Sequence, residues 1–200
     1  MAFSLVELMA VIGVMALLAV VAAPALKGLA GSGGRKQAIS QIMGAFELAR
    51  NTAIATGTNA AVAVPDDTFV SSIYSFRSLA VVAWNPTNST ALPTMVGSWI
   101  NLPEGVAIFP NSVSKLAKAN VSVVLPPFQT NVALLPMIVF QPDGGLLDPA
   151  GGGSFPTNGL AIFEGTVTGT TPNRQGTAKV ETIVLSRFTG RARGTLMNAP

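Results

Sequence analysis

Residues 8–26 read LMAVIGVMALLAVVAAPAL, an uncharged and almost wholly apolar run between Glu7 and Lys27. At about 1.5 Å per residue, a helix of this length rises about 28 Å, close to the ~30 Å hydrocarbon core of a bilayer. The run therefore predicts a membrane-spanning helix. A cleaved secretory signal is the alternative, but no basic residue precedes the run, and Pro24 interrupts the small-residue pattern that a cleavage site needs.

The composition of the 200-residue chain points the same way. Charged residues make up 10% and apolar residues 49%, with a formal net charge of +3, whereas an ordinary soluble protein has roughly 25% charged residues. The chain contains no cysteine and no histidine, which excludes disulfides, thiol nucleophiles and every histidine-dependent catalytic arrangement. These absences remove much of the range of enzyme mechanisms, while paired catalytic carboxylates stay open. No motif identifies an enzymatic site, a cofactor, a metal site or a small-molecule substrate, and we expect none of them.

Glu7 stands out because a carboxylate at the head of an apolar helix is costly to insert into lipid. One explanation is a cation supplied by a neighbouring chain, such as a free amine at Phe3, which would set the register between subunits. The other is a position at the membrane surface, where the positive end of the helix dipole favours an anion. Glu7 alone leaves both explanations open.

The residues around Glu7 carry a family resemblance. Residues 3–9, FSLVELM, followed by the apolar run, resemble the N-terminal signature of type IV pilins and pseudopilins. The resemblance implies that a prepilin peptidase cleaves before Phe3, that Phe3 is N-methylated, and that Glu7 and Pro24 serve subunit assembly. Ala2 stands where the family leader normally ends in Gly, and no basic residue precedes it.

Four segments follow from the composition along the chain. We expect residues 1–26 to form the transmembrane helix and residues 27–36 a Gly-rich joint, flexible or melted, with its Lys and Arg residues near lipid headgroups. Residues 37–57 show helical spacing of apolar residues and end at Gly57 as a C-cap. Residues 58–200 form an extracytoplasmic β-rich domain.

Beyond Gly57, short Val-, Ile- and Phe-rich runs alternate with turn residues, which is typical of antiparallel sheets. The expected fold class is α+β, with a long N-terminal transmembrane helix packed on an antiparallel β-sheet in a pilin-like arrangement. The most loop-like segments are 85–93 and 143–159. The candidate strands are 60–64, 72–76, 79–84, 95–100, 106–109, 121–125, 134–141, 160–164, 179–187 and 191–196.

A second resemblance is to the family that joins pseudopilin H of type II secretion with the pilus protein FimT. It rests on ELARNTAIATGT at 47–58, VFQPDG at 139–144 and IVLSRFTGRAR at 183–193, in the family's order. It implies a minor pseudopilin, a structural subunit of a type II secretion pseudopilus or a type IV pilus-like filament assembled from the inner membrane. Its partners would be other pseudopilins or pilins, the prepilin peptidase and inner-membrane lipid. Its location would be single-pass in the inner membrane with a periplasmic or other extracytoplasmic C-terminal domain.

The Gly-Arg-x-Arg element at 190–193 adds a different possibility, because in FimT-type proteins this element is implicated in holding DNA. Arg191 and Arg193 alternate along an expected strand, so their guanidinium groups would share a face about 7 Å apart. With Arg187 they would form a possible phosphate-binding group. Pairing with the acids of a neighbouring subunit is the alternative, since Phe188 is the one aromatic residue among these arginines.

Three classes of function remain open from the sequence. They are a secretion pseudopilus subunit, a DNA-binding minor pilin, and a membrane-anchored protein with no filament role. Asp66, Asp67, Asp143 and Asp148 could supply oxygen ligands for calcium. Their spacing fits no EF-hand loop, and Asp-Gly is common in turns, so the sequence favours turns over a calcium site.

Overall fold

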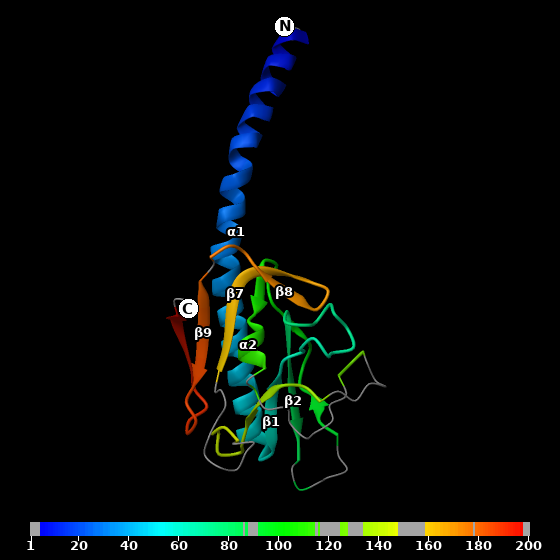
Figure 1. Ribbon diagram of the computed structural model, residues 1–200, viewed down its shortest axis with the longest axis vertical. Helices are drawn as coiled ribbons and strands as arrows, with labels where there is room; N and C mark the ends of the chain where they lie inside the picture. Colours follow the sequence, from blue (N-terminus) through cyan, green and yellow to red (C-terminus); the bar gives the residue numbers. More distant parts are fainter. Residues whose placement is uncertain are drawn as a thin grey trace.

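The computed structural model of this chain begins with one helix, α1, over Leu5–Thr56, which projects beyond the β-structure at its N-terminal end (Figure 1). Gly57, with a φ of 64°, ends it, which confirms the expected C-cap. The side chains of residues 19–32 and 195–197 lie outside the described part of the chain. The structure describes residues 5–85, 87, 92–114, 116, 125–127, 134–147, 159–177 and 179–197.

The second half of α1 packs against the β-structure through small and large apolar side chains. Ile42, Phe46 and Ala49 are completely buried, and their spacing of four and three residues places them on one helix face. Two further apolar residues of this helix, Ile39 and Met43, are only partly buried and pack against the same cluster. This half of α1 contacts strands of both sheets.

The first sheet is antiparallel and has the strand order β3–β2–β1–β6, with β4 also paired to β2. The central strand β1 is buried along its whole length. Ala60 and Val62 face the cluster that includes α1, and Ala61 and Ala63 face a second cluster on the opposite side. The strands are β1 (Asn59–Ala63), β2 (Ser78–Trp84), β3 (Thr94–Met95), β4 (Ile100–Asn101) and β6 (Met137–Phe140).

The second sheet is also antiparallel and has the order β10–β9–β7–β5, with β8 paired to the far half of β7. A short helix, α2 (Pro110–Val113), follows β5. The strands are β5 (Val106–Ile108), β7 (Gly159–Thr168), β8 (Thr171–Arg174), β9 (Val180–Leu185) and β10 (Ala192–Met197).

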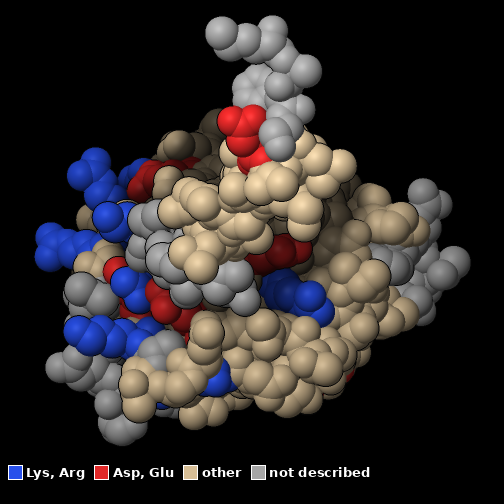
Figure 2. Space-filling view, turned by 90° about the horizontal axis from the view of Figure 1, so that it is seen from above, with Lys and Arg blue, Asp and Glu red and all other residues tan. Residues whose placement is uncertain are grey.

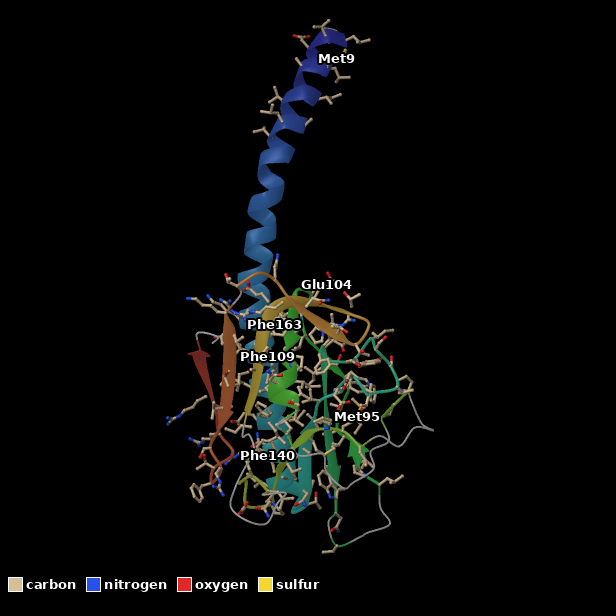
Figure 3. The ribbon with its side chains drawn as sticks, in the orientation of Figure 1. Met9, Met95, Glu104, Phe109, Phe140 and Phe163 are labelled. Atoms are coloured by element: carbon tan, nitrogen blue, oxygen red, sulfur yellow. The ribbon has the colours of Figure 1, made fainter. Side chains whose placement is uncertain are left out.

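Both sheets and α1 share one core. Phe46 on α1 contacts Phe140 on β6 with ring centroids 6.3 Å apart, and Ile162 and Ile183 of the second sheet join the same buried cluster. Phe109 and Phe163 form an edge-to-face pair on the other side of the second sheet, with centroids 5.9 Å apart. Figure 3 labels Phe109, Phe140 and Phe163, and Met9 on the projecting helix.

The expected fold class was wrong. In place of one antiparallel sheet covered by a long helix, the described chain builds two five-stranded antiparallel sheets. Residues 5–18 pack on neither sheet, and all their side chains are exposed. The physical reason is that this stretch is apolar all round and has no single face to direct toward a sheet, whereas the buried stripe of α1 begins at Ala38.

The expected break at residues 27–36 was also wrong, because α1 runs through this segment without interruption. Glycine lowers helix propensity by about 1 kcal/mol per residue, but tertiary contacts support the C-terminal end of the segment. Gly34 lies against Pro103, Glu104 and Val106, and Arg35 forms ion pairs with the second sheet.

The expected strands coincide with observed ones in most places. The exceptions are residues 72–76, which form turns, and 95–100, where two short strands flank a turn at Gly97. The strand β8 was not expected, because its sequence Thr-Pro-Asn-Arg is typical of a turn. Most of 121–125, of 85–93 and of 143–159 lies outside the described residues.

The expected localisation in the inner membrane, with a single pass and an extracytoplasmic domain, was wrong. Within the described residues, no helix meets the length and hydropathy that a membrane crossing demands.

Candidate functional site

The turn between β9 and β10, residues 186–191, presents the arginines that the sequence singled out. It is closed by its own backbone: Ser186 N–H donates to the Arg191 carbonyl at 2.9 Å, and Gly190 N–H donates to the Ser186 carbonyl at 2.8 Å. Gly190 has a φ of 63°, and a Cβ at this position would overlap the carbonyl oxygen of Gly144. Only glycine therefore fits here without displacing the backbone.

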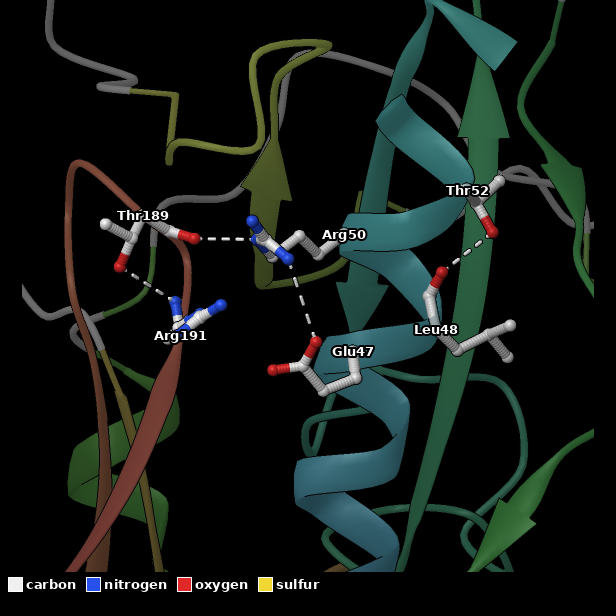
Figure 4. A network of polar contacts seen from close by, with 6 residues as sticks. All are labelled: Glu47, Leu48, Arg50, Thr52, Thr189 and Arg191. Atoms are coloured by element: carbon white, nitrogen blue, oxygen red, sulfur yellow. Dashed lines mark hydrogen bonds and ion pairs between the residues drawn. The ribbon is translucent and has the colours of Figure 1, made fainter. Parts of the chain in front are cut away.

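Arg50 of α1 ties this turn to the helix, as the close view in Figure 4 shows. Its Nε donates to the Thr189 carbonyl at 2.7 Å, and its Nη1 lies 3.9 Å from Glu47 Oε2, one turn earlier on the helix. On the other side, Leu146 N–H donates to the Arg187 carbonyl at 2.8 Å. The turn is thus held by the helix and by the segment that follows β6.

With its backbone fixed, the turn directs its side chains outward. Arg187, Arg191 and Arg193 are all exposed, and Phe188 is 88% exposed. Arg193 pairs in register with the half-buried Val184, whereas its neighbour Ala192 pairs with the buried Leu185. Arg193 therefore lies on the outer face of the second sheet.

The charges are unevenly spread over the molecule. Residues 174–200 contain five basic residues and one acid, Glu181. Figure 2 shows most of the visible Lys and Arg side chains on one side of the molecule, with Asp and Glu side chains among them and further basic side chains near the centre and the lower edge. The arrangement can bind an anionic partner through guanidinium groups and offer one aromatic ring for stacking.

A recess of about 340 Å³ lies beside the turn. Leu146 and Leu147 supply an apolar wall, and Asp143 and Arg187 supply charge at its edge. Asp143 Oδ1 accepts from Gly145 N–H at 2.8 Å, and Gly144 has a φ of 83°. This confirms Asp-Gly at this position as turn chemistry.

The projecting end of α1 is the second candidate surface. It carries ten large apolar side chains with exposed fractions of 52 to 74% among residues 5–18, and Glu7 is the one charged residue in that stretch. Pro24 lies within α1, but its side chain is outside the described part, and Phe3 lies outside it altogether. The exposed residues are Leu5, Val6, Leu8, Met9, Val11, Ile12, Val14, Met15, Leu17 and Leu18.

Arg35 has a different role from the headgroup contact expected for it. Its Nη1 lies 2.9 Å from Glu164 Oε1 on β7, and its Nε lies 3.1 Å from Glu181 Oε2 on β9. All three side chains are 16 to 26% exposed. Arg35 therefore attaches α1 to the second sheet. No sequence signal pointed to this pairing, because the partners are more than a hundred residues away.

Two of the acids considered for calcium, Asp66 and Asp143, accept hydrogen bonds from residues of their own turns. Asp66 is buried, and its Oδ1 accepts from Thr68 N–H at 3.0 Å and from Thr68 Oγ1 at 2.6 Å. Within the part of the chain that the structure describes, no three His, Cys, Asp or Glu residues group as metal ligands would. Asp148 lies outside that part.

No protein-family model, no curated protein and no solved structure matches this chain. The resemblance to pseudopilins therefore rests on the motifs quoted above.

Proposed function

We propose that the chain is a structural, non-enzymatic subunit of a filament related to type II secretion pseudopili and type IV pili. In this proposal, residues 5–18 pack against the same stretch of neighbouring subunits. The observation that carries it is the continuous exposed apolar surface of that stretch. Soluble monomers rarely expose contiguous apolar patches of this kind, and such patches mark sites of association.

The exposed apolar surface of residues 5–18 is better explained by contact with several neighbouring subunits than by contact with one. A fully buried large apolar side chain contributes about 1.5–3 kcal/mol, so partial burial of ten such side chains contributes on the order of 10 kcal/mol. Association costs about 4–15 kcal/mol, so contact with a single neighbour is close to balance. A helix that is apolar on every side is covered only by a bundle, which a filament provides.

Glu7 has a specific place in this proposal. A carboxylate within a bundle of apolar helices is tolerated when a cation lies opposite it. The N-terminal amine of a neighbouring subunit, at Phe3 after cleavage, is the cation that the family resemblance implies. The pair would fix the axial register between subunits, which the apolar side chains alone leave loose.

Cysteine cross-linking tests the filament proposal directly, because the chain has no cysteine of its own. Val11→Cys places a thiol on the projecting helix, and Val70→Cys is a matched control, since Val11 is 52% and Val70 53% exposed. We expect oxidation to give cross-linked dimers for Val11→Cys only. Equal cross-linking of the two variants would contradict the proposal.

DNA binding by the β9–β10 turn is the second candidate, favoured by the exposed Phe188 among three exposed arginines. If it is correct, Arg191→Ala/Arg193→Ala weakens binding of a short DNA duplex and reduces the salt slope by about 2. The control, Lys36→Ala/Arg174→Ala, removes the same charge at exposed positions away from the turn. Two variants with the same effect, or negligible binding by the unmodified chain, would exclude this candidate.

A further inference from the structure

A second recess, of about 540 Å³, lies between the segment that precedes β2, the turn between β4 and β5, and the far half of β7, which pairs with β8. Its volume is in the range of sites that hold small ligands. Glu104 is at its edge, at the end of the β-structure from which α1 projects (Figure 3). Residues that give the recess its character are Ile73, Tyr74, Arg77, Asn101, Glu104 and Thr166.

Arg77 is held in this recess by its backbone. Its N–H donates to the Tyr74 carbonyl at 3.2 Å, and its carbonyl accepts from Leu102 N–H at 2.8 Å. Arg77 directly precedes Ser78, the first residue of β2, which pairs with Asn101 of β4, so the backbone position of Arg77 does not depend on its side chain.

The side chain of Arg77 is left with an unused donor. Its Nε is buried and has no hydrogen-bond partner among the described residues. Buried polar atoms are almost always hydrogen-bonded, and a charged group that lacks an acceptor is especially costly. An arginine in this state, lining a recess, indicates that an external acceptor completes it.

The chemistry of the recess narrows the choice of acceptor. A carboxylate matches the planar fork of donors on a guanidinium group. Arg77 and Glu104 are the two charged residues among the described lining, so the local charge is balanced and a doubly charged phosphate is disfavoured. Ile73, which is 72% exposed, and Val106 and Val167 supply apolar surface.

We propose that this recess binds a carboxylate that carries an apolar group, and that Arg77 is the residue that binds the carboxylate. Two sources share this chemistry: a small free acid, and the C-terminal residue of a peptide. The inference does not rest on the filament proposal, because the recess is formed by the β-structure and not by residues 5–18.

Equilibrium dialysis with the full-length chain tests the proposal. The probe is N-acetyl-L-leucine, and the matched probe is N-acetyl-L-leucinamide, which has the same shape without the charge. We expect the amide to bind at least about tenfold more weakly, the factor that corresponds to the loss of one charge-assisted hydrogen bond. This comparison needs no variant and therefore does not depend on the folding of one.

Three variants locate the site. Arg77→Gln is expected to weaken binding of the acid at least about tenfold, and Thr166→Tyr to abolish it by filling the recess while Arg77 stays in place. Lys36→Gln removes one positive charge at an exposed position of α1 and is expected to leave the affinity unchanged. Circular dichroism verifies the fold of each variant.

The source of the carboxylate follows from free L-leucine and the tripeptide Ala-Ala-Leu as further probes. Tighter binding of the tripeptide supports a peptide C-terminus, and tighter binding of leucine supports a small acid. The proposal is overturned if the acid does not bind at about 10 mM, if acid and amide bind equally, or if Thr166→Tyr leaves binding unchanged.

Discussion

At the scale of single residues, Arg50 and Gly190 decide where the β9–β10 turn lies. Arg50 reaches from α1 to a backbone carbonyl of the turn, and Gly190 allows the turn to approach the backbone at Gly144. Neither residue contributes a side chain to the exposed group of arginines. Both act by fixing the backbone that carries this group.

Replacing Arg50 by Met keeps most of the aliphatic stem and removes the donor to Thr189. We expect a loss of about 1 kcal/mol in the free energy of unfolding, because the hydrogen bond is charge-assisted but the Arg50 side chain is 20% exposed. Urea denaturation measures this value. Arg193→Met, at an exposed position of the outer face, serves as the control and is expected to stay within about 0.5 kcal/mol of the parent chain.

Gly190→Ala is expected to destabilise the protein by about 3 kcal/mol or more, because the new Cβ meets the Gly144 carbonyl and the residue keeps a positive φ. Gly176→Ala is the matched control, since Gly176 has a φ of 55° but open space around its Cα. It carries only the conformational cost of about 1 kcal/mol. Equal shifts in the denaturation midpoints of the two variants would show that the close approach does not matter.

At the scale of elements, the attachment of α1 to the second sheet depends on Arg35. One guanidinium group serves carboxylates on two neighbouring strands, and its removal would leave Glu164 and Glu181 facing each other without a cation. An ion pair that is partly exposed contributes little by itself. A cation shared by two partly buried acids contributes more, since it also offsets their repulsion.

We expect Arg35→Met to lower the free energy of unfolding by about 1–2 kcal/mol, and Glu181→Gln in that background to restore part of the loss. A double-mutant cycle over Arg35 and Glu181 gives the coupling energy. Additive effects of the two substitutions would mean that Arg35 is not coupled to β9.

The elements themselves could largely be predicted from the sequence, and their arrangement could not. Short apolar runs bounded by turn residues located β1, β2, β7 and β9 correctly, and Gly57 located the end of α1. The division into two sheets depends on pairings between distant segments, such as Val106 with Glu164, which leave no local pattern. Strand alternation predicted that Arg191 and Arg193 share one face, but β10 begins at Ala192 and Arg191 lies in the turn before it. The contact from Arg50 to Thr189 left no signal in the sequence.

At the scale of the whole molecule, the projecting end of α1 and the β-structure have separate roles. Residues 5–18 are exposed throughout and join none of the buried clusters. Changes in this stretch should therefore alter association and leave the stability of the remaining structure intact.

Ile12→Lys/Met15→Lys tests this separation. These side chains are 58% and 65% exposed, and two positive charges on the projecting helix oppose its burial against other copies. We expect sedimentation velocity to show a shift to smaller species, while the free energy of unfolding changes by less than about 0.5 kcal/mol. A large loss of stability would show that this stretch packs on its own domain.

The two arginines on α1 have a mechanical consequence. Arg35 and Arg50 both attach the helix to the second sheet, and fifteen residues separate them, which corresponds to about 22 Å along the helix axis. Pulling the projecting end of α1 along the helix axis therefore loads both attachments at the same time, in shear. Pulling that end away from the sheet instead loads Arg35 before Arg50. A single-molecule pulling experiment would detect the loss of Arg35 as a lower rupture force.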